Sequence, residues 1–246
     1  MKWFAKPDFW TLFYERMFPT ESFEQGIAQV DNIVELSGIH SGTVLDLCCG
    51  PGRHSIPLAQ RGFQVTAVDL QENLLDKAKQ YASKTHTHVD FIQGDMRTYK
   101  KAKSFDLAIN MFSSFGYFEV PGDDFIVLEN VFASLKSGGV LVLDVRGKEI
   151  HAMNFRDSLS QTMPNGDLIF ETIKVNDDWT RSEGTWVYVK GERAHRFDII
   201  FNLYSGAELR LLLEQAGFHQ IMLYGDLAGS PYNHNAKRLI AVAKKP

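Results

Sequence analysis

The stretch VLDLCCGPGRHS, residues 44–55, decides the fold class of this chain. Its apolar half contains one acid, Asp46, and two glycines one residue apart, Gly50 and Gly52, lead into a helix-like segment. Because glycine has no Cβ, the backbone of such a turn can approach a ligand closely, and the N–H groups that begin the helix are free to bind it. The stretch therefore predicts a strand, a tight turn and a helix, with a ligand beside the turn.

Strand-like and helix-like segments alternate on both sides of this turn. The strand-like segments cover residues 43–47, 64–70, 89–95, 105–111 and 140–145. The helix-like segments between them cover residues 53–60, 72–83 and 122–136. Most of these strands are almost entirely apolar, which is typical of strands buried on both faces. The pattern predicts an α/β fold with a parallel sheet covered by helices on both faces.

The beginning of the chain and one internal segment depart from this alternation. Helical spacing of apolar residues over 8–18 and 23–37 predicts an N-terminal helical cap, residues 1–42. Between residues 167 and 203, apolar and polar side chains alternate with period two, which predicts antiparallel strands. We therefore expect residues 146–204 to form an inserted antiparallel sheet.

The regular pattern resumes after the insertion. Ser205 and Glu208 form a capping-box pair at the start of a helix-like segment, residues 205–218. Strand-like segments over 219–226 and 237–245 follow it. The core is thus expected to combine residues 43–145 with 205–246, in one integrated domain with the cap and the insertion.

Charge and cysteine content argue against several classes of protein. The formal net charge of −4 disfavours a broad nucleic-acid-binding surface, which needs clustered Lys and Arg. The two cysteines, Cys48 and Cys49, are adjacent and indicate a reducing compartment without a disulfide framework. We expect no signal peptide, and the sequence has no run of 18 apolar residues. It therefore predicts a cytoplasmic protein without a membrane span.

The cysteine pair itself allows three interpretations. A metal site would need further ligands at useful spacing, and redox pairs have residues between the two cysteines. We therefore expect no metal and interpret Cys48 and Cys49 as small residues that pack the turn. The glycine turn is also incomplete as a dinucleotide fingerprint, because Ser55 stands where a third glycine belongs.

Acids follow two of the next strands at informative positions. Asp69 lies about 20 residues after the turn, the spacing of an acid that accepts from ribose hydroxyls, although it also suits an N-cap of the next helix. In GDM, residues 94–96, Asp95 can accept from an adenine amine while Met96 packs on the ring, although Gly-Asp is also a common turn. The end of residues 105–111 would lie beside them. All these positions follow parallel strands, where ligands bind in open α/β sheets.

These segments together resemble the class I S-adenosylmethionine-dependent methyltransferases, in particular their small-molecule branch. The matching segments are VLDLCCGPGRHS, VTAVDL, VDFIQGDM, FDLAINMFSSFGYF and LKSGGVLVLDV, within residues 43–145. The resemblance implies a Rossmann-like, mostly parallel sheet of seven strands in the order 3-2-1-4-5-7-6. It also implies that the N-terminal helices and the 146–204 insertion form a cap and a lid.

The resemblance implies S-adenosyl-L-methionine as cofactor and S-adenosyl-L-homocysteine as product. The residues it assigns to the cofactor are Tyr14, Asp46, Gly50, Gly52, Asp69, Leu70, Asp95, Met96, Asn110 and Met111. Among them Asp46 would order the glycine turn, and Tyr14 would close over the cofactor. Tyr14 is equally compatible with a buried helix face shared with Trp10 and Phe18.

The implied reaction is in-line transfer of a methyl group to an N or O atom of a small-molecule acceptor. Positioning supplies much of the rate in such a transfer, so a catalytic triad is not required. His234 and Tyr14 are the candidate catalytic residues, with His151, His195, Glu119 and Glu149 as further candidate bases. Arg146, Phe115 and Tyr117 are the candidate substrate residues, although Arg146 also suits a surface ion pair and the aromatic residues also suit the core.

Two alternatives remain open at this point. One is a methyltransferase acting on RNA or protein, although NMFSS, residues 110–114, lacks the prolines often found there in enzymes that methylate base amines. The other is a cofactor-binding regulator without catalysis. The sequence predicts no oligomeric state.

Overall fold

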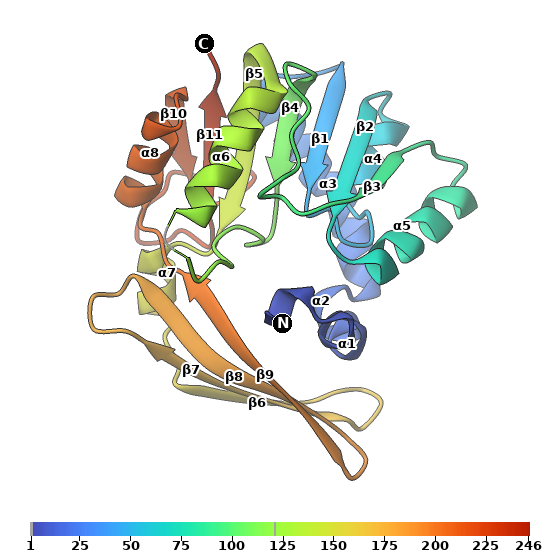
Figure 1. Cartoon of the computed structure of the whole chain (residues 1–246), viewed down its shortest axis with the longest axis vertical. Helices are drawn as coiled ribbons and strands as arrows, with labels where there is room; N and C mark the ends of the chain where they lie inside the picture. The colour runs from blue at the N-terminus through green and yellow to red at the C-terminus, as the bar shows by residue number, and fades with distance from the viewer. Residues whose placement is uncertain (1, 121) are drawn as a thin grey trace.

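A seven-stranded sheet forms the centre of the molecule, in the order β10-β11-β5-β4-β1-β2-β3 (Figure 1). The structure is a computed structural model that describes residues 2–120 and 122–246. The strands are β1 (Thr43–Leu47), β2 (Gln64–Asp69), β3 (Asp90–Gln93), β4 (Phe105–Asn110), β5 (Leu135–Val145), β10 (His219–Tyr224) and β11 (Leu239–Lys244). Strands β1 to β5 pair in parallel, and β11 runs antiparallel to both β5 and β10. With β10 and β11 counted as the sixth and seventh strands of this sheet, the predicted order 3-2-1-4-5-7-6 is confirmed.

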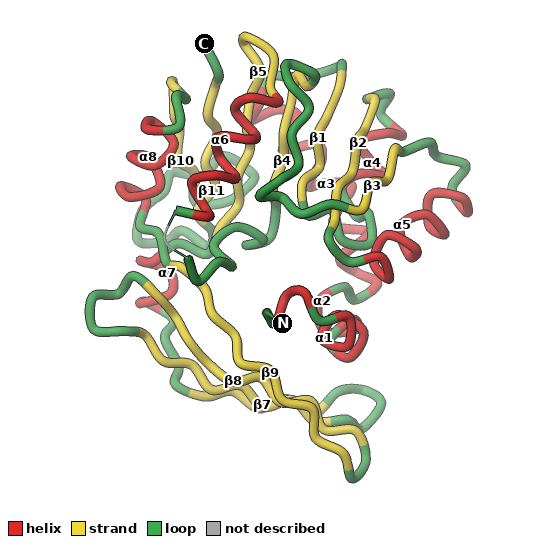
Figure 2. The backbone as a smooth tube through the Cα atoms, viewed as in Figure 1, coloured by secondary structure: helices red, strands yellow, loops and turns green. Residues whose placement is uncertain are grey.

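Helices cover both faces of this sheet, as predicted (Figure 2). On one face α3 (Thr20–Ser37), α4 (Ser55–Gln60) and α5 (Glu72–Lys84) contribute to a core with Val44 and Leu107. On the other face α6 (Asp123–Ser134) and α8 (Gly206–Gln215) pack on Leu45 and Leu141. Successive strand residues point to opposite faces, and both faces of the inner strands are buried, so β1, β2, β4, β5 and β11 are mostly apolar, whereas the edge strands β3 and β10 are partly exposed. No helix within the described ranges is long and apolar enough to cross a membrane.

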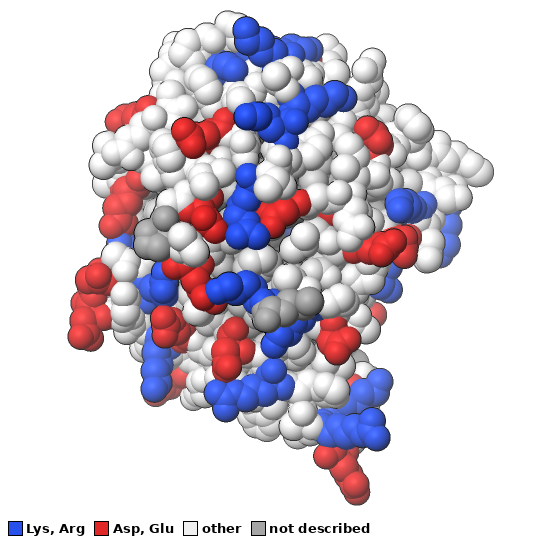
Figure 3. Space-filling view, in the orientation of Figure 1, with Lys and Arg blue, Asp and Glu red and all other residues white. Residues whose placement is uncertain are grey.

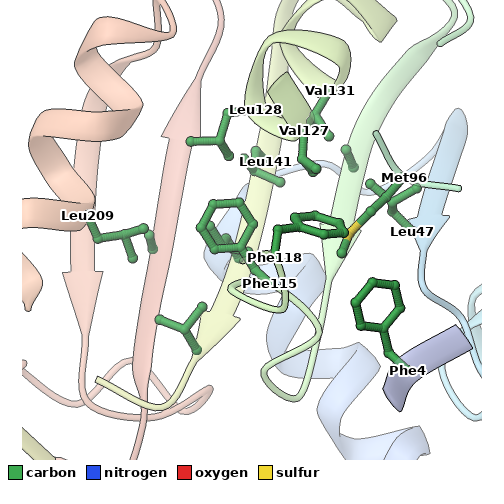
Figure 4. Close-up of a cluster of buried hydrophobic side chains, with 14 of the residues drawn as sticks. Phe4, Leu47, Met96, Phe115, Phe118, Val127, Leu128, Val131, Leu141 and Leu209 are labelled. Carbon is green, nitrogen blue, oxygen red and sulfur yellow. The ribbon is translucent and has the colours of Figure 1, made fainter. Parts of the chain in front are cut away.

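The second of these cores continues beyond the sheet into the beginning of the chain (Figure 4). It extends from Leu128 of α6 through Phe115 and Phe118 to Phe4. Phe4 lies in a short 3-10 helix, η1 (Trp3–Ala5), and its ring centroid is 5.6 Å from that of Phe118. The N-terminal segment is therefore anchored to the loop that follows β4.

The predicted helix over residues 8–18 is interrupted. The structure has α1 (Pro7–Leu12) and α2 (Tyr14–Met17), with Phe13 between them at a non-helical ψ of 9°. Phe9 and Phe13 are fully buried, with stacked rings 4.9 Å apart. The chain bends at Phe13 because both rings pack against a second sheet, a long-range contact that helical spacing does not report.

The inserted segment forms this second sheet, which we call the lid sheet. Its strands are β6 (Ser158–Thr162), β7 (Leu168–Val175), β8 (Arg181–Lys190) and β9 (Arg193–Asn202), all antiparallel in the order β6-β7-β8-β9. A short helix, α7 (Lys148–Met153), precedes it. All residues of β6 are exposed, which explains why apolar alternation began only near residue 167. The N-terminal segment lies between the two sheets (Figure 1).

Aromatic side chains hold the lid sheet onto α1 and the turn that follows it. The ring centroids of Phe9 and Phe197 are 5.2 Å apart, and those of Phe13 and Tyr188 are 5.4 Å apart. At its other end the lid sheet is hydrogen-bonded to α6, because the Asp124 carboxylate accepts from Asn202 Nδ2 at 2.7 Å and from the Tyr204 hydroxyl at 2.6 Å. The lid sheet is thus attached at both ends.

Candidate active site

The carboxyl ends of β1, β2 and β4 border a cavity of about 210 Å³, which we call the strand-end cavity. The turns that follow these strands and β3 contribute Asp46, Cys48, Cys49, Gly50, Asp69, Leu70, Gln71, Asp95, Met96, Met111 and Phe112. The N-terminal segment contributes Phe4, Trp10, Met17 and Phe18. Segments far apart in sequence therefore meet at the edge of the sheet where open α/β folds bind ligands.

The two glycines of the turn after β1 have different surroundings. Gly50 borders the cavity at a φ of 55°, and a Cβ there would lie 3.3 Å from the Phe18 ring. Gly52 has a φ of 83° but does not border the cavity, and a Cβ on it would lie 3.2 Å from Ala78 and Ile56. At Gly50 the cavity wall is therefore backbone without a side chain, whereas the missing Cβ of Gly52 lets α4 pack closely on α5.

Asp69 joins the turn after β1 to the turn after β2. Its carboxylate accepts from the backbone N–H of Gly50 and of Gln71, each at 2.8 Å. Asp69 is 8% exposed, and burial raises its pKa to about 6. No side-chain cap of α5 is formed. Asp69 therefore places a carboxylate at the cavity wall that fixes the glycine turn.

Asp46 lies behind the turn and is bonded to the residue that replaces the third glycine. The Ser55 hydroxyl donates to the Asp46 carboxylate. Asp46 is 1% exposed, and burial raises its pKa to about 7. Ser55 therefore has a structural reason to be present: its hydroxyl satisfies a buried acid at the base of the turn.

The remaining residues predicted to hold a cofactor lie close by but have varied surroundings. Asp95 is held by Arg97, whose Nη2 lies 2.6 Å from Oδ2; although burial opposes it, these hydrogen bonds lower the pKa of Asp95. Met96, Leu70 and Met111 border the cavity. Asn110 does not border it: its amide donates to the Leu47 carbonyl at 3.1 Å, and its buried Oδ1 has no hydrogen-bond partner among the residues that the structure describes.

Two residues that sequence reasoning did not select, Arg53 and His54, also line the strand-end cavity. Arg53 is 8% exposed, its guanidinium carbon lies 3.4 Å from the Phe112 ring centroid, and burial lowers its pKa to about 10. No carboxylate in the described part of the chain lies within ion-pair distance of it. His54 is buried, and its Nε2 lies 2.8 Å from Oε1 of Gln29. Burial holds the pKa of His54 well below 6.5. The sequence feature that could have identified this site is a cationic residue, Arg53, directly after the glycine turn.

The loop after β4 has a strained backbone that positions Phe112. Phe112 and Ser113 both have positive φ, 57° and 61°, which is costly for residues with a side chain. Buried Asp144 stabilises the loop, because its Oδ2 accepts from the Phe112 N–H at 3.0 Å and its carbonyl from the Ser113 N–H at 2.9 Å. Arg238 Nε donates a hydrogen bond to Asp144 Oδ1 at 2.7 Å and so holds this carboxylate beside the loop.

Phe112, Met17 and Tyr117 also border a second cavity, of about 250 Å³, between the loop after β4 and the lid sheet. We call it the lid cavity. Its other walls include Phe115, Arg146, His151, Glu171, Trp186, Ile199, Phe201 and Tyr204. All three residues predicted to contact a substrate, Phe115, Tyr117 and Arg146, therefore lie around one cavity next to the strand-end cavity.

The residues predicted to be catalytic lie elsewhere. Tyr14 borders neither cavity and instead has the Lys77 ammonium 4.1 Å from its ring centroid. His234 is exposed in the loop between β10 and β11, also outside both cavities. Of the further candidate bases, only His151 borders a cavity. Among the described residues, no group of three or more His, Cys, Asp or Glu side chains is arranged to hold a metal ion.

Comparison with known sequences finds similarity in the part of the chain that borders the strand-end cavity. Residues 44–139 match the family described as methyltransferase domain. A Bacillus subtilis (strain 168) protein, YqeM, provisionally named a methyltransferase, is 29% identical over 217 residues, which cover 86% of this chain and 87% of that protein. A demethylmenaquinone methyltransferase of Staphylococcus aureus (strain JH9) is 26% identical over 233 residues, with 90% and 86% covered.

Solved structures show the same fold over nearly the whole chain. An S-adenosylmethionine-dependent methyltransferase from Clostridium acetobutylicum ATCC 824 has a TM-score of 0.79 at 16% identity, with 97% of this chain and 98% of that chain covered. The sugar N-methyltransferase KedS8 from Streptoalloteichus sp ATCC 53650 has a TM-score of 0.68 at 19% identity, with 96% and 92% covered. The likeness includes the cap and the lid sheet, since so little of the chain lies outside it.

Proposed function

We propose that this protein transfers a methyl group from S-adenosyl-L-methionine to a small-molecule acceptor, because residues 44–139 match the methyltransferase-domain family and the fold is that of S-adenosylmethionine-dependent methyltransferases. The cofactor would occupy the strand-end cavity, and the acceptor would occupy the lid cavity. The observation that carries the proposal is that these two cavities share three wall residues, Met17, Phe112 and Tyr117. A donor and an acceptor placed in them would therefore be in contact with the same side chains.

The groups around the strand-end cavity fit this cofactor. The Asp69 carboxylate can accept hydrogen bonds from ribose hydroxyls. The Arg53 guanidinium, which has no carboxylate partner within the described ranges, matches the carboxylate of a methionine moiety. Leu70 and Met96 offer apolar surface for the adenine ring. Asp46, behind the turn, would keep the Gly50 backbone in place.

When bound, S-adenosyl-L-methionine supplies a methyl group already activated by the sulfonium charge. The protein's contribution is positioning, which can supply roughly 7 kcal/mol or more in well-oriented reactions. Phe112 and Tyr117 place aromatic faces where the two cavities meet, and such faces stabilise positive charge. Phe4 and Met17, from the N-terminal segment, close the space against water. Tyr14 and His234 lie outside both cavities, and we assign them no part in the transfer.

A small acceptor suits the lid cavity better than a nucleic acid or a protein. Its volume of about 250 Å³ lies between the sheet edge and the lid sheet, and Phe115, Tyr117 and Arg146 would contact its occupant. The face of the molecule in Figure 3 has Lys and Arg interspersed with Asp and Glu, without a continuous basic surface. Relatives named for the methylation of a sugar nitrogen and of demethylmenaquinone support a small acceptor with a nucleophilic atom.

An activity screen tests this proposal. The protein is incubated with methyl-labelled S-adenosyl-L-methionine and fractionated pools of small metabolites, and labelled products are counted together with S-adenosyl-L-homocysteine. We expect label in a small-molecule fraction, in amounts equal to the S-adenosyl-L-homocysteine released. Label that appears only in added RNA or protein would contradict the acceptor class, and binding of the cofactor without any transfer would indicate a regulator.

A further inference from the structure

The walls of the lid cavity carry one cation, Arg146, and two acids, Glu171 and Glu183. Glu171 of β7 borders the cavity and is 4% exposed, but its carboxylate is paired with Arg16 of α2. Arg146, directly after β5, borders the same cavity, and no carboxylate among residues 2–120 and 122–246 lies within ion-pair distance of it. Glu183 and Arg146 are both exposed in part to solvent, which weakens the interaction between their charges. Arginine stays protonated at neutral pH, so Arg146 is a cation of the cavity without a direct ion-pair partner in the described part of the chain, although the charge of Glu171 acts on it from the same cavity.

A second polar group in the same cavity also lacks a partner. His151 of α7 is 4% exposed, and its Nε2 is buried without a hydrogen bond in the described structure. Burial, followed by the charge of Arg146, lowers the pKa of His151 to about 4. The imidazole is therefore neutral at pH 7, and in the tautomer that carries its hydrogen on Nε2 it can donate from that nitrogen. A buried polar nitrogen without a partner is costly, and a bound ligand would remove that cost.

The rest of the lid cavity is apolar. Phe115, Trp186, Ile199 and Phe201 form much of its wall. Such walls favour a ligand with a flat or apolar body, while a few polar groups fix its orientation. Arg146 and His151 border only the lid cavity, whereas Phe112 borders both cavities. A charged group bound by Arg146 and His151 would therefore leave the other part of the ligand free to reach the junction of the cavities.

We infer that the acceptor is an anion: Arg146 binds its carboxylate or phosphate group, His151 donates a hydrogen bond from Nε2 to the same group, and its apolar body lies between the aromatic walls. The inference rests on the proposed function, because it names the class of acceptor for that site. Arginine suits this role because its planar fork binds carboxylate and phosphate oxygens in pairs. Arg146 and His151 would thus determine specificity without taking part in the transfer itself.

Binding of three simple probes to the full chain tests the inference without a known acceptor. Benzoate, phenyl phosphate and the neutral benzamide are titrated calorimetrically, with and without S-adenosyl-L-homocysteine. We expect at least one of the two anions to bind at least about tenfold more tightly than benzamide, as a charge-assisted hydrogen-bond pair does. The comparison of benzoate with phenyl phosphate then shows which anionic group the site prefers.

Three variants locate this preference in the lid cavity. Arg146→Gln is expected to reduce anion affinity to about that of benzamide, and His151→Phe to weaken it several-fold, whereas His151→Gln, which keeps a donor, retains more of it. Arg196→Gln is the matched control, since Arg196 is exposed beside Asp198 on the lid sheet. Circular dichroism and binding of S-adenosyl-L-homocysteine show that each variant is folded.

The outcomes separate this inference from the proposed function. Equal affinity for benzamide and the anions, no binding of either anion, or an unchanged preference in a folded Arg146→Gln variant would overturn the anionic acceptor. Each of these results can occur while S-adenosyl-L-homocysteine binds normally. Conversely, an anion preference that depends on Arg146, in a protein that binds no S-adenosyl-L-homocysteine, would uphold the charge of the cavity and overturn the cofactor assignment.

Discussion

At the scale of single residues, the glycine turn shows what one sequence position can and cannot indicate. Ser55 weakened the dinucleotide interpretation because it replaces a glycine, and the structure shows its hydroxyl bound to Asp46. The position of Asp69 at a strand end was predictable from its spacing. Its hydrogen bond to Gly50 was not, because that bond joins two turns 19 residues apart. The position of Arg53 beside the cavity was not predictable either, because its guanidinium lies against the ring of Phe112, a residue from a distant loop.

The pKa of Asp69 predicts how cofactor affinity depends on pH. Burial raises this pKa to about 6, so the carboxyl group becomes protonated below pH 6 and no longer accepts from two ribose hydroxyls. Affinity for S-adenosyl-L-homocysteine should therefore fall as the pH drops below about 6, by up to about tenfold per pH unit. Calorimetric titrations between pH 5 and 8 measure the dependence. Asp69→Asn should bind weakly with no such slope, and a wild type whose affinity is constant from pH 8 to 5 would remove Asp69 from the ribose site.

The position of Arg53 predicts that its replacement lowers the affinity for S-adenosyl-L-homocysteine more than the affinity for methylthioadenosine. Arg53→Gln removes the guanidinium that would bind the methionine carboxylate, so affinity for S-adenosyl-L-homocysteine should fall by about 1.5–3 kcal/mol. Affinity for methylthioadenosine, which has no carboxylate, should be nearly unchanged. Arg61→Gln is the control, because Arg61 pairs with Asp31 away from both cavities. Equal losses for both ligands would mean that Arg53 supports the turn and does not bind the carboxylate.

At the scale of elements, the sheet was easier to predict than the parts that cover its edge. Strands β1, β2, β4 and β5 are mostly apolar because both of their faces are buried, and that local property appears directly in the sequence. Strand β6 was missed because its side chains are exposed. The bend at Phe13 was missed because it depends on Tyr188, about 175 residues away in the chain. Elements that depend on distant partners carry little local signal.

The packing of α1 on the lid sheet predicts a large effect on stability. Phe9 is fully buried, and its ring lies 5.2 Å from Phe197 and 5.8 Å from Trp186. Phe9→Ala should lower the free energy of unfolding by about 3–5 kcal/mol, because it removes buried surface and leaves a cavity. Urea denaturation measures the change, with Ile27→Ala as the control because Ile27 is 52% exposed. A loss below about 1 kcal/mol would show that the cap and the lid sheet are not packed together in solution.

At the scale of the whole molecule, three layers supply the walls of the two neighbouring cavities. The sheet edge supplies Asp69, the N-terminal segment supplies Met17, and the lid sheet supplies Trp186. The resemblance to methyltransferases implied the order of the strands, which the structure confirms, and the sequence predicted the edge of the sheet at which we expect a ligand. It did not predict the second cavity, because that cavity exists only where the lid sheet, α7 and the loop after β4 meet.

The most direct test of this account is a calorimetric titration of the full chain with S-adenosyl-L-homocysteine and, separately, with NAD. We predict one site for S-adenosyl-L-homocysteine and none for NAD. Asp69→Asn should weaken binding by roughly 1–3 kcal/mol through the loss of charge-assisted hydrogen bonds. Asp76→Asn, an exposed position on α5, should leave it unchanged. A wild-type protein that binds NAD, but neither S-adenosyl-L-homocysteine nor S-adenosyl-L-methionine, would contradict the account.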